Sequence, residues 1–515
     1  MDRRRFLWQT LLAMPAARAA GENPNLEEIT LEGLAKGFAE KRFTARSVTE
    51  WYLARIDALD RKGPAVRAVI EINPEALAIA DSLDAERRAK GPRGPLHGVP
   101  VLVKDNIETA DRMSTTAGSL ALAGSVAVRD AFVAERLRAA GAVILGKTNL
   151  SEWANFRSTH SVSGWSGRGG QTRNPYATDR NPCGSSSGSA AGVAANFCAV
   201  AVGTETDGSV TAPASVNGIV GIKPTVGLIG ARGIIPIAHS QDTAGPMART
   251  VRDAALLLGA LAGDDPRGRK DYTGSLDPRG LRGARLGVER KFFGANAAMD
   301  RVLEECLTEL KRQGATLIDP ANLPSHGQYD DDELTVLLYE FKADLNAYLA
   351  GLRPNIRVRS LADLIAFNRE HRNQEMPYFE QELFERAQAK GPLTEKGYLD
   401  ARAKCVRLSR AEGIDAVIQQ FKVQAIVAPT AGPAPLVDYI TGDPNWPGCT
   451  TPAAVAGYPH VTVPAGFAHG LPVGISFFGA AWSEPMLLKL AYAFEQATKA
   501  RRQPGFAATI DPARQ

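Results

Sequence analysis

Helical and strand-like segments alternate along much of this chain, and this alternation restricts the possible folds more than any other feature. Residues 130–140 have helical spacing and stop at Gly141, and the apolar run 142–145 follows as a buried strand. The same order returns where a helical pattern ends before Gly314 and a strand pattern follows at 316–318. Helices that alternate with buried strands predict an α/β fold, in which helices cover both faces of a large twisted mixed β-sheet.

The 515 residues, of which 44% are apolar, are enough for one large core. We therefore expect a single domain over 21–515, with a helical lobe at about 330–415, where long helical patterns replace strand signals. Ser47 and Glu50 have the spacing of a capping box, which predicts that a helix opens at Ser47. The loop 443–447 is predicted to form a pocket wall. Strand signals return after the lobe at 425–428, 461–463 and 473–478.

The first twenty residues have the pattern of a twin-arginine signal peptide. Arg3 and Arg4 precede a short apolar stretch, and the small-residue sequence 17–19 follows as a cleavage site. The apolar part is too short to cross a membrane, which takes about 20 residues. We therefore expect export, to the periplasm, without stable membrane insertion.

Charge and cysteine usage exclude several classes of protein. The formal net charge is only +4, with 60 Lys and Arg among 56 Asp and Glu, so nothing indicates a nucleic-acid partner. The five cysteines have no C-x-x-C spacing, and their odd number argues against a disulfide framework. The seven histidines form no H-E-x-x-H pair. No metal site and no cofactor are therefore predicted.

Three glycine-bordered segments place a lysine and two serines where their side chains have room to act. Lys104 follows the apolar run 99–103, as a residue delivered by a strand into a dry interior would, and Ser185 and Ser209 lie in loops. A serine hydroxyl is a poor nucleophile until a base takes its proton, and a lysine is such a base only when burial holds it neutral. The segments are HGVPVLVKDN at 97–106, NPCGSSSGSAAG at 181–192 and GTETDGSVTAPA at 203–214.

The stretch from Cys183 to Pro213 resembles the signature of the amidase signature family of Ser-Ser-Lys hydrolases. The two serines of that family lie 24 positions apart, as Ser185 and Ser209 do here. Within the family, GTETDGS followed by GIIPIAHSQDTAGPM is most similar to the peptide amidases, which remove the terminal amide from C-terminally amidated peptides. Further matches are 130–154, 218–229, 240–255 and 457–467.

The resemblance implies an amidase-signature fold and hydrolysis of a carboxamide C–N bond, in a peptide or a small amide, to carboxylate and ammonia. It makes Ser209 the acylated nucleophile, Ser185 the bridging serine after a cis peptide bond, and Lys104 the terminal base. It assigns the oxyanion hole to the backbone N–H groups of Thr206, Asp207, Gly208 and Ser209.

The chain departs from the commonest family pattern at the nucleophile. Many members have Gly-Gly-Ser followed by arginine two residues later, whereas this chain has Asp207 in place of the first glycine and Thr211 in place of the arginine. Aspartate tolerates a left-handed backbone better than most residues, which would preserve the turn. Its carboxylate either hydrogen-bonds internally or faces the pocket, and this bears on the substrate class.

Two other functions are open to the same loop. Residues 184–188 satisfy G-x-S-x-G, the nucleophile elbow of α/β-hydrolase esterases, with Ser186 as nucleophile and His239 or His460 as its histidine. That elbow follows a buried strand, whereas residues 171–183 are turn formers. A non-catalytic exported binding protein that holds an anion at a helix N-terminus is the third possibility. The loop lacks the Lys-Ser/Thr ending of a P-loop, and release of ammonia would separate an enzyme from a binding protein.

Overall fold

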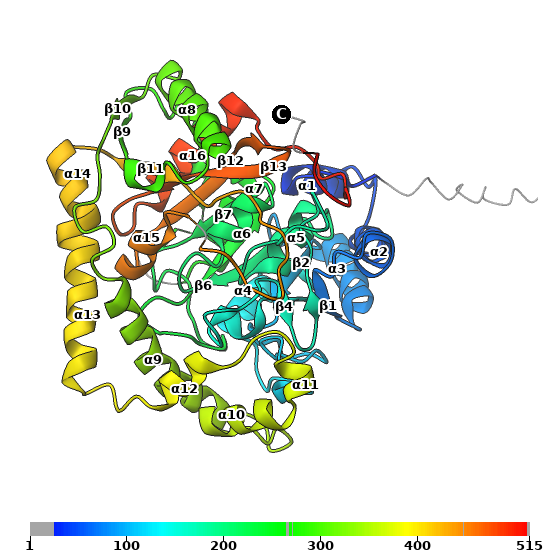
Figure 1. The fold of residues 1–515 in the computed structure, drawn as a ribbon. Coiled ribbons are helices and arrows are strands. Elements are labelled where there is room, and N and C mark those ends of the chain that lie inside the picture. Colours follow the sequence, from blue (N-terminus) through cyan, green and yellow to red (C-terminus); the bar gives the residue numbers. More distant parts are fainter. Residues whose placement is uncertain (1–24, 264–266, 270, 446, 512–515) are drawn as a thin grey trace, which may run out of the picture.

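The computed structural model describes residues 25–511 apart from 264–266, 270 and 446, so the predicted signal segment lies outside the described residues. Its centre is an eleven-stranded mixed sheet in the order β1-β3-β2-β6-β8-β7-β12-β13-β11-β9-β10, with helices on both faces (Figure 1). The strands are β1 (Val69–Ile72), β2 (Pro100–Lys104), β3 (Val143–Thr148), β6 (Val200–Glu205), β7 (Val220–Lys223), β8 (Thr243–Ala248), β9 (Arg285–Val288), β10 (Thr316–Ile318), β11 (Ala425–Pro429), β12 (His460–Ala468) and β13 (Leu471–Phe478), with a separate pair β4 (Trp165–Ser166) and β5 (Gly170–Gln171).

Two helices that the sequence predicted before glycines are present. The helix predicted before Gly141 and the one before Gly314 are α4 and α8, and each is followed by its strand. The helices are α1 (Leu31–Ala39), α2 (Ala45–Arg55), α3 (Ala76–Lys90), α4 (Phe132–Ala139), α5 (Ser187–Ala194), α6 (Thr211–Val216), α7 (Val251–Leu261), α8 (Ala297–Arg312), α9 (Asp330–Ala350), α10 (Leu361–Glu370), α11 (Arg372–Glu375), α12 (Glu382–Gln388), α13 (Lys396–Ser409), α14 (Asp415–Phe421), α15 (Thr450–Ala456) and α16 (Glu484–Thr498).

The predicted start of α2 was wrong by two residues. The helix begins at Ala45, and Thr44 is its N-cap, because the Thr44 hydroxyl accepts from the Ser47 backbone N–H while the Ser47 hydroxyl accepts from the Thr44 N–H. Ser47 thus takes the position that Glu or Gln usually holds in a capping box. Short polar side chains are suited to both the N-cap and the third helical position, so the sequence pattern alone did not show which of the two Ser47 occupies.

The sheet brings the ends of its central strands to one edge. β2 runs parallel to β6, with Val103 opposite Val202, so Lys104 and Glu205 end their strands at the same edge. β6 is antiparallel to β8, and Glu205 pairs with Thr243. The chain that leaves β6 and the chain that enters β8 therefore lie at this edge as well.

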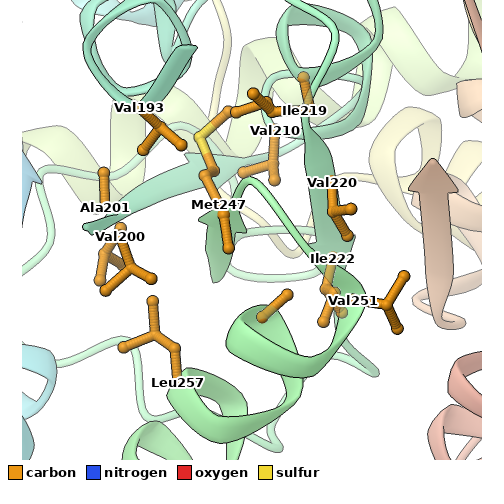
Figure 2. Packing of buried hydrophobic residues seen from close by; sticks show 14 of the residues in the cluster. Val193, Val200, Ala201, Val210, Ile219, Val220, Ile222, Met247, Val251 and Leu257 are labelled. Atoms are coloured by element: carbon orange, nitrogen blue, oxygen red, sulfur yellow. The ribbon is translucent and has the colours of Figure 1, made fainter. Parts of the chain in front are cut away.

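Buried aliphatic side chains fill the layer between these strands and the helices beside them (Figure 2). Val210, one residue after Ser209, belongs to this core and is fully buried. The chain is therefore anchored by packing immediately after Ser209. Other members of the cluster are Val193 from α5, Val200 and Ala201 from β6, Val220 and Ile222 from β7, Met247 from β8 and Leu257 from α7.

Helices α9 to α14 make up the chain between Asp330 and Phe421, and no strand interrupts this described stretch. The first of them run along the lower side of the molecule in Figure 1. They have an apolar cluster of their own, in which Phe341 of α9 stacks on Phe384 of α12 at 5.4 Å between ring centroids. Within the described part of the chain, none of the helices has the length and apolar character that a membrane crossing requires.

Candidate active site

Lys104 ends β2 inside the protein, with its ammonium nitrogen next to Ser185. The Lys104 side chain is fully buried, and its Nζ lies 2.7 Å from Ser185 Oγ. Burial lowers the pKa of Lys104 to about 7, although the negative charges of Asp242 and Glu205 oppose that shift. A lysine with such a pKa is neutral in a large fraction of molecules near neutral pH.

Thr204 of β6 supplies the other contacts of the lysine. Lys104 Nζ donates to Thr204 Oγ1 at 2.8 Å and to the Thr204 carbonyl oxygen at 3.2 Å. Asn106 Nδ2 also donates to Thr204 Oγ1, at 3.0 Å. The sequence motifs gave no signal for Thr204, because its place beside Lys104 comes from the pairing of β2 with β6.

The two serine loops lie against each other. The peptide bond between Gly184 and Ser185 is cis, as the family resemblance implies, and Ser185 is fully buried. The backbone N–H of Ser186 donates to the Ser209 carbonyl oxygen at 3.1 Å. The structure therefore brings Lys104, which is 81 positions from Ser185 in the sequence, next to the two serine loops.

Ser209 sits in a tight turn between β6 and α6. Gly208 adopts a left-handed conformation with φ of 72°, whereas Asp207 keeps a negative φ. The turn is therefore preserved with the left-handed conformation at the glycine and not at the aspartate. Glu205 fixes the far side of the turn, because its Oε2 accepts from the Val210 N–H at 2.8 Å and from the Thr211 N–H at 2.9 Å.

Ser186, the nucleophile of the esterase alternative, has a structural role. Its hydroxyl donates to the Thr204 carbonyl oxygen and accepts from the Thr204 N–H, both at 3.1 Å. Turns and loops precede it instead of a buried strand. His460, one of its proposed partners, is buried with Nε2 2.5 Å from Ser476 Oγ. The nucleophile elbow therefore lacks the preceding buried strand that it requires.

Two carboxyl groups lie close to the turn before Ser209. Thr451 Oγ1 of α15 donates to Asp207 Oδ2 at 2.6 Å, so the Asp207 carboxylate hydrogen-bonds internally. Burial raises the pKa of Asp207 to about 6. Burial, reinforced by the charge of Asp207, raises the pKa of Glu333 on α9 well above its usual value. Sequence motifs did not indicate Glu333.

A cavity of about 340 Å³ opens beside this turn, and Thr451 forms part of its wall. Asn445 and Pro447 line it, so the predicted wall loop does contribute to a pocket. Such a volume lies at the small end of the range for ligand sites. The rest of the lining combines aromatic side chains with charged and polar ones: Phe292, Phe293, Tyr329, Lys291, His326 and Asp330.

One group of side chains in the described residues has the composition of a metal site. His239, Glu340 and Asp344 bring their ligand atoms within 4.8 Å of one another. His239 Nδ1 lies 2.8 Å from Asp344 Oδ2, and Glu340 is already held by hydrogen bonds from Ser240 N–H and Tyr398 O–H. These direct contacts account for the cluster as a link between α9 and the segment before β8. All five cysteines are free and buried.

The chain is similar to known amidases along most of its length. The family model described as Amidase matches residues 47–488, a range that contains Lys104, Ser185 and Ser209. A probable amidase of Arabidopsis thaliana is 45% identical over 503 residues, which cover 94% of this chain and 93% of the relative.

Solved structures of amidases are also similar to this chain. The native peptide amidase from Stenotrophomonas maltophilia superposes with a TM-score of 0.88 at 51% identity, over 94% of this chain and 99% of that chain. The peptide amidase PAM in complex with the competitive inhibitor chymostatin gives a TM-score of 0.89, also at 51% identity, over 93% and 99% of the two chains. An amidase family protein from Bacillus anthracis gives a TM-score of 0.84 at 36% identity, over 93% of this chain and 92% of its own.

Proposed function

Because this chain belongs to the amidase family and hydrolyses amide C–N bonds, we propose that it removes the terminal carboxamide of peptides, with Ser209 as nucleophile, Ser185 as bridging serine and Lys104 as base. The observation that carries the assignment is the 2.7 Å contact between buried Lys104 Nζ and Ser185 Oγ. The position of that contact after the cis peptide bond of Gly184 also supports it.

The surroundings of the lysine suit the work of a base. A neutral amine carries two N–H groups and one lone pair. Thr204 offers two acceptors, its hydroxyl and its carbonyl oxygen, at 2.8 and 3.2 Å from Lys104 Nζ. With both N–H groups donated to Thr204, the lone pair is left for the third contact and accepts the proton of Ser185.

The reaction then proceeds by acyl transfer to water. Lys104 takes the proton of Ser185, Ser185 takes the proton of Ser209, and Ser209 Oγ attacks the amide carbonyl carbon. The backbone N–H groups of Thr206, Asp207, Gly208 and Ser209 stabilise the oxyanion. The proton returns along the relay to the nitrogen as the C–N bond breaks, and ammonia leaves. Water, activated through the same relay, hydrolyses the acyl-enzyme and releases the carboxylate.

Two observations favour a peptide amide over a simple aliphatic amide. The cavity beside the turn contains aromatic side chains, Phe292 and Tyr329, among polar ones, and such a mixed lining suits an amidated residue with its peptide groups. The second is that the similar native structure from Stenotrophomonas maltophilia, 51% identical over 94% of this chain, is that of a peptide amidase. The alternatives of an esterase based on Ser186 and of a non-catalytic binding protein have no support in the comparisons.

The test combines active-site labelling with a substrate panel. A serine-reactive fluorophosphonate should label Ser209, as mapped by mass spectrometry, and Ser209→Ala should abolish both labelling and ammonia release. N-acetyl-phenylalaninamide should be hydrolysed faster than acetamide, as judged by kcat/KM. Adduct formation on Ser186 would contradict the assignment of the nucleophile, and a preference for acetamide would contradict the substrate class.

We further propose that the enzyme is exported in folded form, as the Arg3-Arg4 pair and the short apolar stretch after it indicate. A folded enzyme would carry its cysteines already buried into an oxidising compartment.

A further inference from the structure

The segment 239–242 joins the helical lobe to the nucleophile turn. Thr206 Oγ1 donates to Asp242 Oδ1 at 2.6 Å. The side-chain amide of Gln241 donates to two acceptors, Glu333 Oε1 at 2.8 Å and the Thr206 carbonyl oxygen at 3.3 Å. Gln241 and Glu333 are both buried. One side-chain amide therefore connects α9 to the backbone three residues before Ser209.

Two further carboxyl groups of α9 hold the same segment. Glu340 Oε2 accepts from the Ser240 N–H at 3.0 Å. Asp344 Oδ2 accepts from the His239 N–H, also at 3.0 Å. Residues 333, 340 and 344 are seven and four positions apart, so they lie on one face of the helix. The segment 239–242 is therefore fixed against about three turns of α9. The contacts of His239 and Ser240 thus help to hold Gln241 in place.

The peptide plane explains why this contact bears on catalysis. The Thr206 carbonyl and the Asp207 N–H belong to one planar peptide unit and point in opposite directions. An acceptor bond that fixes the carbonyl of Thr206 therefore fixes the direction of the Asp207 N–H. That N–H is one of the donors assigned above to the oxyanion hole, where alignment with the developing charge decides much of the rate.

We propose that Glu333 is a positioning residue, which acts through Gln241 on the Thr206–Asp207 peptide and so aligns the oxyanion hole. The inference rests on the proposed function, because it takes the hole to lie at residues 206–209. Burial, together with the charge of Asp207, raises the pKa of the Glu333 carboxyl and so favours its neutral form. A neutral carboxyl still offers Oε1 as an acceptor, and it places no full negative charge near the oxyanion.

Three variants of adjacent residues test this role. Glu333→Ala removes the acceptor of Gln241, whereas Glu333→Gln keeps an acceptor oxygen at the same position. Asp332→Asn is the matched control, because Asp332 lies in the same turn of α9 and contacts Lys404 on α13 instead of Gln241. For each variant, kcat and KM are measured by ammonia release from N-acetyl-phenylalaninamide and normalised to the folded fraction from thermal unfolding.

We expect Glu333→Ala to lower kcat at least tenfold with KM changed less than threefold, and Glu333→Gln to recover kcat to within threefold of the wild type. Asp332→Asn should match the wild type. A purely structural role would lower the unfolding temperature and leave kcat per folded molecule unchanged, which would overturn the proposal. Failure of Glu333→Gln to recover kcat would also overturn it.

Gln241→Met provides a second route to the same link if Glu333→Ala does not fold. It should lower kcat as Glu333→Ala does, because it removes the donor to the Thr206 carbonyl oxygen. Labelling by the fluorophosphonate distinguishes failure of the positioning role from failure of the proposed function. If Ser209 is labelled and Gln241→Met keeps the kcat of the wild type, only the positioning role fails; if Ser209→Ala remains active, the proposed function fails.

Discussion

The buried lysine leads to a quantitative prediction for the pH dependence of the reaction. Only neutral Lys104 accepts a proton, so kcat/KM should follow the neutral fraction of this side chain in the free enzyme. Burial lowers its pKa from 10.5 to about 7. The direction of the effect is therefore fixed: activity is lost as the pH falls through the pKa of the folded enzyme and Lys104 becomes charged.

The size of the effect follows from that pKa. With a pKa of about 7, roughly half of the Lys104 side chains are neutral at pH 7 and roughly one in a hundred at pH 5. We therefore expect kcat/KM to fall about 50-fold between these values, with a limiting slope of about tenfold per pH unit. Without burial, roughly one lysine in three thousand would be neutral at pH 7. The lowered pKa thus raises the active fraction about a thousandfold.

The assay is ammonia release from N-acetyl-phenylalaninamide between pH 5 and 9, since this substrate has no titrating group in the range. Lys104→Ala should cut the rate by several orders of magnitude and flatten the acid limb. Lys104→Arg should not recover the rate, because a guanidinium remains protonated. The reasoning would be refuted if Lys104→Ala kept the acid limb while substitution of His239 or His460 removed it.

Three further predictions concern packing, a buried ion pair and export. Gly188→Ala should lower the unfolding temperature, because a Cβ there meets the Ala68 carbonyl oxygen at 2.1 Å, whereas Gly192→Ala on the same helix, with its nearest atom at 3.5 Å, should not. Arg157→Met should lower the free energy of unfolding in denaturant by about 3 to 5 kcal/mol. Fully buried Arg157 contacts the carboxyl group of Glu152 at 2.6 Å, and the substitution leaves that group without its partner. Replacement of Arg3 and Arg4 by lysine should leave active precursor in the cytoplasm, as cell fractionation would show, and unchanged export would contradict the twin-arginine interpretation.

The sequence predicted the residues of the site whose signals are local. Lys104 follows an unbroken apolar run, and Ser185 and Ser209 lie in short glycine-rich stretches, so each could be identified from a few neighbouring residues. Thr204 and Gln241 could not be identified in this way. Thr204 reaches Lys104 through the pairing of β2 with β6, and the segment of Gln241 reaches the turn because β8 runs antiparallel to β6.

The alternation of helices and strands predicted the layers for the same reason, since the period of apolar residues is a local property. It could not predict which strands become neighbours. The sheet places β8 between β6 and β7. The strands β6 and β7 follow one another in the sequence but are therefore not neighbours in the sheet. The docking of α9 is still less local, because Glu333 meets Gln241 across 92 positions of the chain. Register and docking depend on the whole core, which no short pattern encodes.

The departure at Asp207 shows how the turn can vary without losing its geometry. A left-handed backbone is needed at only one position, and Gly208 holds it with φ of 72°. A Cβ at that glycine would also meet Thr450 Oγ1 at 2.9 Å. Asp207 keeps a negative φ, so a side chain is tolerated there, and its carboxylate accepts from Thr451 at the edge of the cavity. The glycine next to the serine is therefore the position that the backbone requires, and the residue before it is free to join the turn to α15.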